Sequence, residues 1–341
     1  MEKYSQYRDR GSGIAPFFAV PTQPSGVALP FHFFLFVCRV PLLLTASAVY
    51  FLLLSWLPVG SLIKKAALWL MLGIPGVWWI DLQIDGVRRG SLAKHDKNRL
   101  PHPGSIIASS FTSPLDTLYL ATIFDPIFTI SYPSTRSVQR ISLFRALLLA
   151  FQHPVEVPPK NAKLTTLAKL LAQNPSATIV VLPECTTTNG RGILPFSPSL
   201  LTAPAKTKIF SISLRYTPGD VTTPIPGSYL QFLWNLCSKP THCIRVRIAE
   251  AMYNNSASEN SASTSARAAS PQPGYHVKAN SLEGMEFGEP VADADGDLNA
   301  EEKQVLDRVA EDLARLGRVK RVGLGVKEKS DFVKAWTKKR R

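Results

Sequence analysis

The chain has 341 residues, of which 45% are hydrophobic, so it can bury a large core and is not an intrinsically disordered protein. Its formal charge of +14 indicates an anionic partner, either nucleic acid or the negative cytosolic face of a membrane. The four cysteines show no CxxC pair and no zinc-ligand spacing, which favours a reduced, cytosol-facing domain over a disulfide-rich or zinc-binding protein.

The N-terminal part of the chain predicts attachment to a membrane. Residues 1–30 mix charge with Gly, Ser and Pro without a period, so we expect a disordered tail. Residues 40–57 are apolar, and as a helix they would extend about 27 Å, enough to cross a hydrocarbon core. The shorter segment 66–80 holds three tryptophans and predicts a helix at the membrane interface, with a buried core helix as the alternative.

Two lysines between these apolar segments bear on the topology. If both segments crossed the membrane, Lys64 and Lys65 would lie on its far side, against the preference of basic residues for the cytosol. A single crossing leaves both lysines in the cytosol. We therefore expect one spanning helix, with the chain after residue 57 in the cytosol.

Strand-like and helix-like segments alternate from residue 104 onward. Their alternation predicts an α/β fold, with a central mixed or parallel sheet flanked by helices. The run 178–182 reads as a buried strand, and polar residues follow it directly. In α/β sheets ligands bind at the carboxyl ends of strands, so a site is expected there. The other expected strands are 105–109, 128–132, 210–214 and 242–249, and the expected helices are 113–121, 141–151, 162–172 and 229–236.

The C-terminal part combines a linker, a helix and a basic tail. Asn299 and Glu302 form the pattern of a capping box ahead of a leucine and valine stripe, which predicts an amphipathic helix. The basic tail could contact nucleic acid, but it lacks a nucleic-acid-binding motif, and a membrane surface is the better partner. The predicted organisation is a tail (1–30), a membrane region (31–80), an α/β domain (81–253), a flexible Ser/Ala/Asn-rich linker (254–275), and a C-terminal helix with a basic tail (276–341).

Two polar blocks carry a family resemblance. Residues 109–116 read SSFTSPLD and residues 183–191 read PECTTTNGR. The first resembles the Asn-His-Thr-Ser-Pro-x-Asp block, and the second the Pro-Glu-Gly-Thr block, of the glycerolipid (lysophospholipid) acyltransferases. Within that family the chain is most similar to the 1-acylglycerol-3-phosphate acyltransferase type, in its fungal lysophosphatidic acid acyltransferase-like branch. The resemblance covers residues 104–251.

The resemblance implies a membrane enzyme that transfers a fatty acyl group from acyl-CoA to a lysophospholipid, with lysophosphatidic acid as the expected acceptor. Acyl-CoA would then be a co-substrate, with no cofactor and no metal. The implied partners are acyl-CoA, a lysophospholipid and membrane lipids, and no nucleic acid. The expected location is the endoplasmic reticulum membrane or the lipid droplet surface.

The family's catalytic His and Asp fall on Phe111 and Asp116. Phenylalanine cannot accept a proton, so the base that acyl transfer requires is not assigned. His102 and His153 are the histidines nearest to the blocks and are the candidates for a displaced base. The alternative function is an inactive or weakly active protein of the same fold that binds lipid or acts as a scaffold.

The substrate-binding positions implied by the resemblance are Thr112, Ser113, Glu184, Cys185, Thr186 and Arg191. Cys185 stands where the family usually has glycine. The Thr188-Asn189-Gly190 turn would return Arg191 towards Glu184, where its guanidinium could bind a phosphate monoester while Glu184 held it. The next candidates for the headgroup are Arg145, Lys160 and Arg215.

Overall fold

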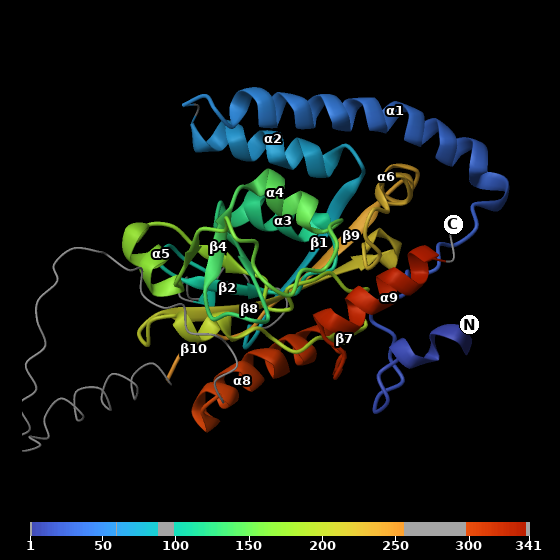
Figure 1. The fold of residues 1–341 in the computed structure, drawn as a ribbon. Coiled ribbons are helices and arrows are strands. Elements are labelled where there is room, and N and C mark those ends of the chain that lie inside the picture. Colours follow the sequence, from blue (N-terminus) through green and yellow to red (C-terminus); the bar gives the residue numbers. More distant parts are fainter. Residues whose placement is uncertain (1, 59, 88–98, 256–297, 339–341) are drawn as a thin grey trace, which may run out of the picture.

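A computed structural model describes residues 2–58, 60–87, 99–255 and 298–338 (Figure 1). In this part of the chain, nine strands form one mixed sheet with the order β1-β9-β8-β2-β6-β3-β4-β5, and β10 pairs with β8. The strands are β1 (Val77–Ile84), β2 (Ile106–Ser109), β3 (Ile127–Ser131), β4 (Val138–Ile141), β5 (Leu164–Thr165), β6 (Ile179–Val181), β8 (Lys208–Thr217), β9 (His242–Ile248) and β10 (Met252–Tyr253).

The centre of the sheet is parallel. β2 pairs in parallel with both β6 and β8, and β3 pairs in parallel with β6. The segments that follow β2, β6 and β8 therefore leave the same edge of the sheet. The α/β fold predicted from the alternating pattern is confirmed, and the pairs β3–β4, β4–β5 and β8–β9 towards the two sides of the sheet are antiparallel.

Both faces of the central strands are buried. Ile107, Val180 and Phe210 belong to the hydrophobic cluster on one face, whereas Ile106 and Ile179 belong to the cluster on the other. Successive side chains of a strand point to opposite faces, so a continuous apolar run is what a strand covered on both sides requires.

Helices cover the two faces of the sheet. Figure 1 shows α3 and α4 against one face, with α2 and then α1 outside them, and α8 across the opposite face. The helices are α1 (Leu29–Ala48), α2 (Ser61–Gly73), α3 (Pro114–Phe124), α4 (Leu143–Leu149), α5 (Leu167–Gln173), α6 (Tyr229–Cys237), α8 (Ala300–Gly317) and α9 (Val326–Lys338). The predicted capping box of Asn299 and Glu302 starts α8, and its leucine and valine stripe is buried.

In the described residues, one helical stretch, 26–54, is long and apolar enough to cross a membrane. The predicted span thus begins earlier in the chain than residue 40. α1 lies along the domain, and Arg39 in its middle donates hydrogen bonds to the backbone carbonyls of Pro75, Lys239 and Pro240. These bonds tie the helix to the end of α6 and the start of β1.

The predicted interfacial helix 66–80 is wrong in its second half. α2 ends at Gly73, and residues 77–84 form β1, which pairs in parallel with β9. Trp78 and Trp79 are 68% and 67% exposed on this edge strand. An apolar run alone does not distinguish a helix from a strand. Here the parallel pairing with β9 makes residues 77–84 a strand.

The predicted disordered tail 1–30 is also wrong. A 3-10 helix (Glu2–Tyr7) opens the chain, and Phe17 is fully buried. The ring centroid of Phe17 lies 6.2 Å from that of Phe332 in α9, and Tyr4 packs edge-on against the same ring at 5.9 Å. The aromatic residues of the segment find their partner more than 300 residues away, which local composition cannot reveal.

The C-terminal segment packs on protein and does not offer its apolar residues to a membrane. Val322 and Phe332 are buried, and β11 (Lys320–Arg321) pairs in parallel with β7 (Gly192–Ile193). The apolar residues of this tail therefore belong to the protein core, and the expected contact of its basic residues with a membrane surface stays a prediction. From residue 256, the predicted linker lies outside the described residues.

Replacing Phe17 tests the docking of the N-terminal segment. Removal of a buried phenyl ring costs about 3–5 kcal/mol in a protein core, so Phe17→Ala should release the segment and expose Arg8 and Arg10 to trypsin. Faster cleavage in detergent is the expected result. Val27→Ala is the control, because Val27 is fully exposed. Equal protection in both variants would contradict the docking.

Candidate functional site

The two polar blocks meet at the carboxyl edge of the parallel strands. The Thr188 N–H donates to the Phe111 carbonyl at 3.1 Å, and the Thr223 N–H donates to the Thr112 carbonyl at 2.9 Å. Between them lies a cavity of about 260 Å³. Its lining comes from both blocks, from β8 and from the N-terminal segment: Val20, Thr112, Asn189, Gly190, Arg191, Leu214, Arg215, Tyr216, Gly219 and Thr222.

The first block starts α3 and buries Asp116. One carboxylate oxygen, Oδ2, accepts hydrogen bonds from the Thr112 N–H at 2.6 Å, the Thr112 hydroxyl at 3.1 Å and the Ser113 N–H at 2.9 Å. The other oxygen, Oδ1, accepts from the hydroxyl of Tyr216. Burial raises the pKa of Asp116 to about 6, although these hydrogen bonds favour the ionised form.

Phe111 cannot serve as a base and is fully buried in the hydrophobic cluster that also holds Leu115 and Tyr216. The structure does not bring the two candidate histidines to the site. His102 lies just ahead of β2, at the opposite end of that strand from the first block, and its ring nitrogen contacts the Pro103 carbonyl. His153 is exposed after α4. No described histidine lines the cavity.

The second block buries Glu184 behind the turn. Its Oε2 accepts the Leu194 N–H at 3.3 Å, while Oε1 has no hydrogen-bond partner. Burial raises the pKa of Glu184 to about 8, well above the usual range of a carboxyl group.

Arg191 lines the cavity but does not pair with Glu184 in the described structure, because one Glu184 oxygen accepts the Leu194 N–H and the other has no partner, so the predicted contact between them is corrected. Glu184 is buried, whereas Arg191 is exposed. The turn between them is bound to the N-terminal segment. The Asn189 amide donates to the carbonyls of Ala15 and Phe18, at 2.8 and 2.9 Å. Its N–H donates to the Pro16 carbonyl at 2.9 Å.

Cys185 adopts φ +58°, in the left-handed region that favours glycine. This geometry gives a physical reason for the glycine that the family usually has here. Burial raises the pKa of the thiol to about 12, so it is neutral and not a nucleophile. The residue is thus part of the turn at the strand end and is not a reactive group.

Lys329 of α9 reaches into the second block, and sequence analysis missed it. The side chain is fully buried, and its Nζ donates to Thr186 Oγ1 at 2.9 Å, to the Thr187 carbonyl at 2.6 Å and to Thr187 Oγ1 at 2.9 Å. Burial lowers the pKa of Lys329 to about 7, and the charge of Glu184 partly offsets that effect. The available signal was a lysine on the apolar face of α9, three residues after Val326 and three before Phe332.

The residues implied by the resemblance therefore divide into two groups. Thr112 and Arg191 line the cavity. Ser113, Glu184, Cys185 and Thr186 shape the two blocks around it, since Ser113 caps α3 and Thr186 binds Lys329. Their contacts with a substrate stay a prediction. Of the next candidates for the headgroup, Arg215 lines the cavity, whereas Arg145 and Lys160 do not.

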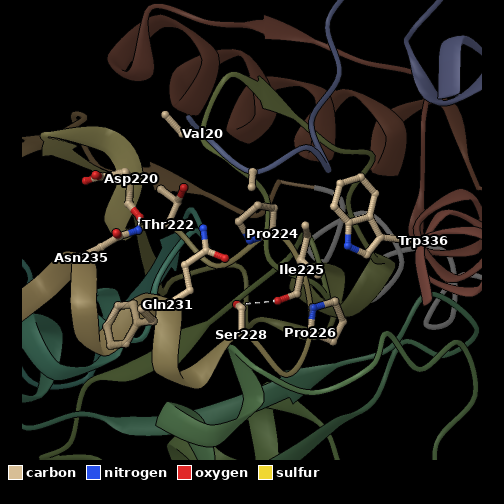
Figure 2. Close-up of a pocket in the computed structure, with 12 residues that line it drawn as sticks. Val20, Asp220, Thr222, Pro224, Ile225, Pro226, Ser228, Gln231, Asn235 and Trp336 are labelled. Atoms are coloured by element: carbon tan, nitrogen blue, oxygen red, sulfur yellow. Dashed lines mark hydrogen bonds between the residues drawn. The ribbon is translucent and has the colours of Figure 1, made fainter. Parts of the chain in front are cut away.

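A second cavity, of about 140 Å³, adjoins the first (Figure 2). Figure 2 shows Gln231 and Asn235 of α6 on one side of it and Trp336 of α9 on the other. Val20 and Thr222 line both cavities. The N-terminal segment is therefore a wall that the two cavities share.

Two fungal relatives are similar to this chain over most of its length. One, provisionally named a lysophosphatidic acid:oleoyl-CoA acyltransferase, comes from Schizosaccharomyces pombe and is 28% identical over 73% of this chain and 84% of its own. The other, lysophosphatidic acid:oleoyl-CoA acyltransferase 1 of Saccharomyces cerevisiae, is 24% identical over 70% and 80%. No protein-family model and no solved structure matches the chain.

Thr186→Val tests whether Lys329 stabilises the second block, because the buried Thr186 hydroxyl accepts from Lys329 at 2.9 Å. The change removes one acceptor from a buried ammonium group, so it should lower the free energy of unfolding by about 1–3 kcal/mol, measured in detergent. The matched control is Thr122→Val, because the buried Thr122 hydroxyl only bonds back to Leu118 within α3. An equal, small effect of both changes would show that Lys329 does not need Thr186.

Proposed function

We propose that this chain, a homologue of fungal proteins named as lysophosphatidic acid acyltransferases, transfers a fatty acyl group from acyl-CoA to the free hydroxyl of lysophosphatidic acid. The observation that carries the proposal is the meeting of the two blocks, about 80 residues apart in the chain, at one cavity that contains two arginines. Acyl-CoA is the co-substrate. Transfer from a thioester to a hydroxyl needs a base and donors for the oxyanion, and no resident cofactor.

The two arginines support an acceptor that carries a phosphate. A guanidinium can bind a phosphate monoester through paired hydrogen bonds, and Arg191 and Arg215 line the cavity together. Burial lowers the pKa of Arg215, and the charges of Arg247 and Arg245 lower it further. An anion bound beside Arg215 would relieve this crowding of positive charge.

The alternative of a non-catalytic protein of the same fold rested on Phe111. It has no support from the relatives, both of which are named as acyltransferases. The buried carboxylate of Asp116 accepts a hydrogen bond from Tyr216, and Tyr216 lines the cavity. A group able to take part in proton transfer is therefore present. We therefore favour an enzyme.

We propose further that the protein works at the cytosolic face of the endoplasmic reticulum membrane or on lipid droplets. The outer side of α1, of α2 and of the segment between them presents apolar side chains, including Phe34, Leu52, Trp56 and Leu62, which are 55% exposed or more. Both flanks of the long apolar helix contact the same domain, since the N-terminal segment packs on α9 and α2 packs on α3. This packing favours a helix that lies along the membrane over one that separates its flanks across it.

Arg191→Lys and Arg215→Lys test phosphate recognition. Lysine keeps the charge but loses the planar fork, so each variant should raise the KM for lysophosphatidic acid roughly tenfold, about 1.4 kcal/mol, in a detergent assay with labelled acyl-CoA. Arg140→Lys on β4 is the matched control, because Arg140 is exposed and lies outside the cavity.

Monoacylglycerol, which lacks the phosphate, separates recognition from general damage. Acyl transfer to monoacylglycerol should be equally slow with the parent and with both variants. If the parent transfers no acyl group to any lysophospholipid, the proposed function is wrong. If the variants match the parent with lysophosphatidic acid, the phosphate binds elsewhere.

Tags at the two ends of the chain test the membrane arrangement. Because the N-terminal segment contacts α9, protease added to sealed microsomes should remove an N-terminal and a C-terminal tag alike. Protection of the N-terminal tag alone would indicate the single crossing expected from the sequence. A lumenal protein measured in the same vesicles controls for leakage.

A further inference from the structure

Acyl transfer requires a group that takes the proton of the attacking hydroxyl, and this site has no histidine for it in the described residues. The environment of Asp116 indicates what replaces it. Three donors occupy Oδ2, and they come from the block that starts α3. Oδ1 is left for one donor from another element, the hydroxyl of Tyr216 at the end of β8.

Tyr216 connects the buried carboxylate to the cavity. It lines the cavity beside Arg215 and Leu214 and is 8% exposed, whereas Asp116 is fully buried and does not line it. Its neighbour in β8, Arg215, is one of the two arginines proposed to hold the acceptor's phosphate. The two side chains leave opposite faces of β8, since Arg215 donates to the Gly317 carbonyl of α8 and Tyr216 donates to Asp116 of α3. Both line the cavity because it lies at the end of the strand.

We propose that Tyr216 and Asp116 form a proton relay that takes over the part of the absent histidine. The oxygen of the acceptor hydroxyl forms a bond to the thioester carbon, and its proton moves to the Tyr216 oxygen. The Tyr216 proton moves at the same time to Asp116 Oδ1. When the carbon–sulfur bond breaks, the protons return along the same path and the coenzyme A thiolate leaves as the thiol. The inference rests on the proposed acyl transfer.

The charges around the pair suit this division of roles. Burial and the charge of Asp116 raise the pKa of Tyr216 well above its usual value, so the tyrosine stays protonated and cannot act alone as a base. Burial raises the pKa of Asp116 to about 6, which makes it a stronger proton acceptor than an exposed aspartate. Tyr216 therefore contacts the substrate and Asp116 acts through it.

Tyr216→Phe is the central test, in a transfer assay with labelled acyl-CoA and lysophosphatidic acid. The ring remains, so KM for both substrates should stay within about threefold, while kcat should fall roughly 100-fold or more, within the range of general acid–base catalysis. Tyr119→Phe is the matched control and should keep the parent's kcat. Tyr119 is a buried tyrosine in the same cluster, and it does not line the cavity.

Asp116→Asn provides an independent second variant. Its amide oxygen can still accept the Thr112 and Ser113 N–H groups, so α3 keeps its cap, but the relay loses its acceptor. A comparable fall in kcat is expected, and the double variant should lose little more, since groups that act as a unit are not additive. Thermal unfolding in detergent identifies the variants that fold. If Tyr216→Phe does not fold, the kcat of Asp116→Asn alone tests the relay.

The outcomes separate the relay from the proposed function. An active parent whose kcat survives Tyr216→Phe or Asp116→Asn within threefold overturns the relay and leaves acyl transfer standing. A fall that appears in KM and not in kcat also overturns it, because it assigns Tyr216 to binding. A parent that transfers no acyl group to any lysophospholipid overturns both.

Discussion

The parallel pairing of β2 with both β6 and β8 is the constraint on which the site depends. Because the three strands run in one direction, the first block, the second block and the end of β8 all emerge at one edge. Two backbone hydrogen bonds, from Thr188 to Phe111 and from Thr223 to Thr112, then hold the segments together. A functional site can therefore be assembled from residues more than 100 positions apart, such as Thr112 and Tyr216, without either block having to reach far from the sheet.

Ionisable groups are buried at this edge, and each is stabilised differently. Asp116 is surrounded by hydrogen-bond donors, whereas Lys329 has three oxygens for its ammonium group. Glu184 has one donor and one unpaired oxygen, and burial raises its pKa to about 8. Burying such groups costs free energy that hydrophobic residues would not. Their concentration here is typical of a functional site and not of a structural core.

Local patterns predicted the core of the fold well and its borders poorly. The strand 179–181, the start of α3 at Pro114 and the cap of α8 follow from short-range periodicity and turn chemistry. The tail 1–30 and the strand at Trp78 and Trp79 could not be predicted, since both depend on partners far along the chain. At the site, the blocks located the cavity, but Lys329 and Tyr216 lie outside any motif, and only the tertiary fold brings them there.

The contact between the first and last described elements sets a condition on how the protein is made. Phe17 is synthesised more than 300 residues before its partner Phe332. Asn189 can bind the N-terminal segment only once that segment has docked on the domain. The wall at Val20 that both cavities share is therefore completed only once α9 has been synthesised and has docked on the N-terminal segment. A nascent or C-terminally truncated chain would carry an open site, whatever the state of its sheet.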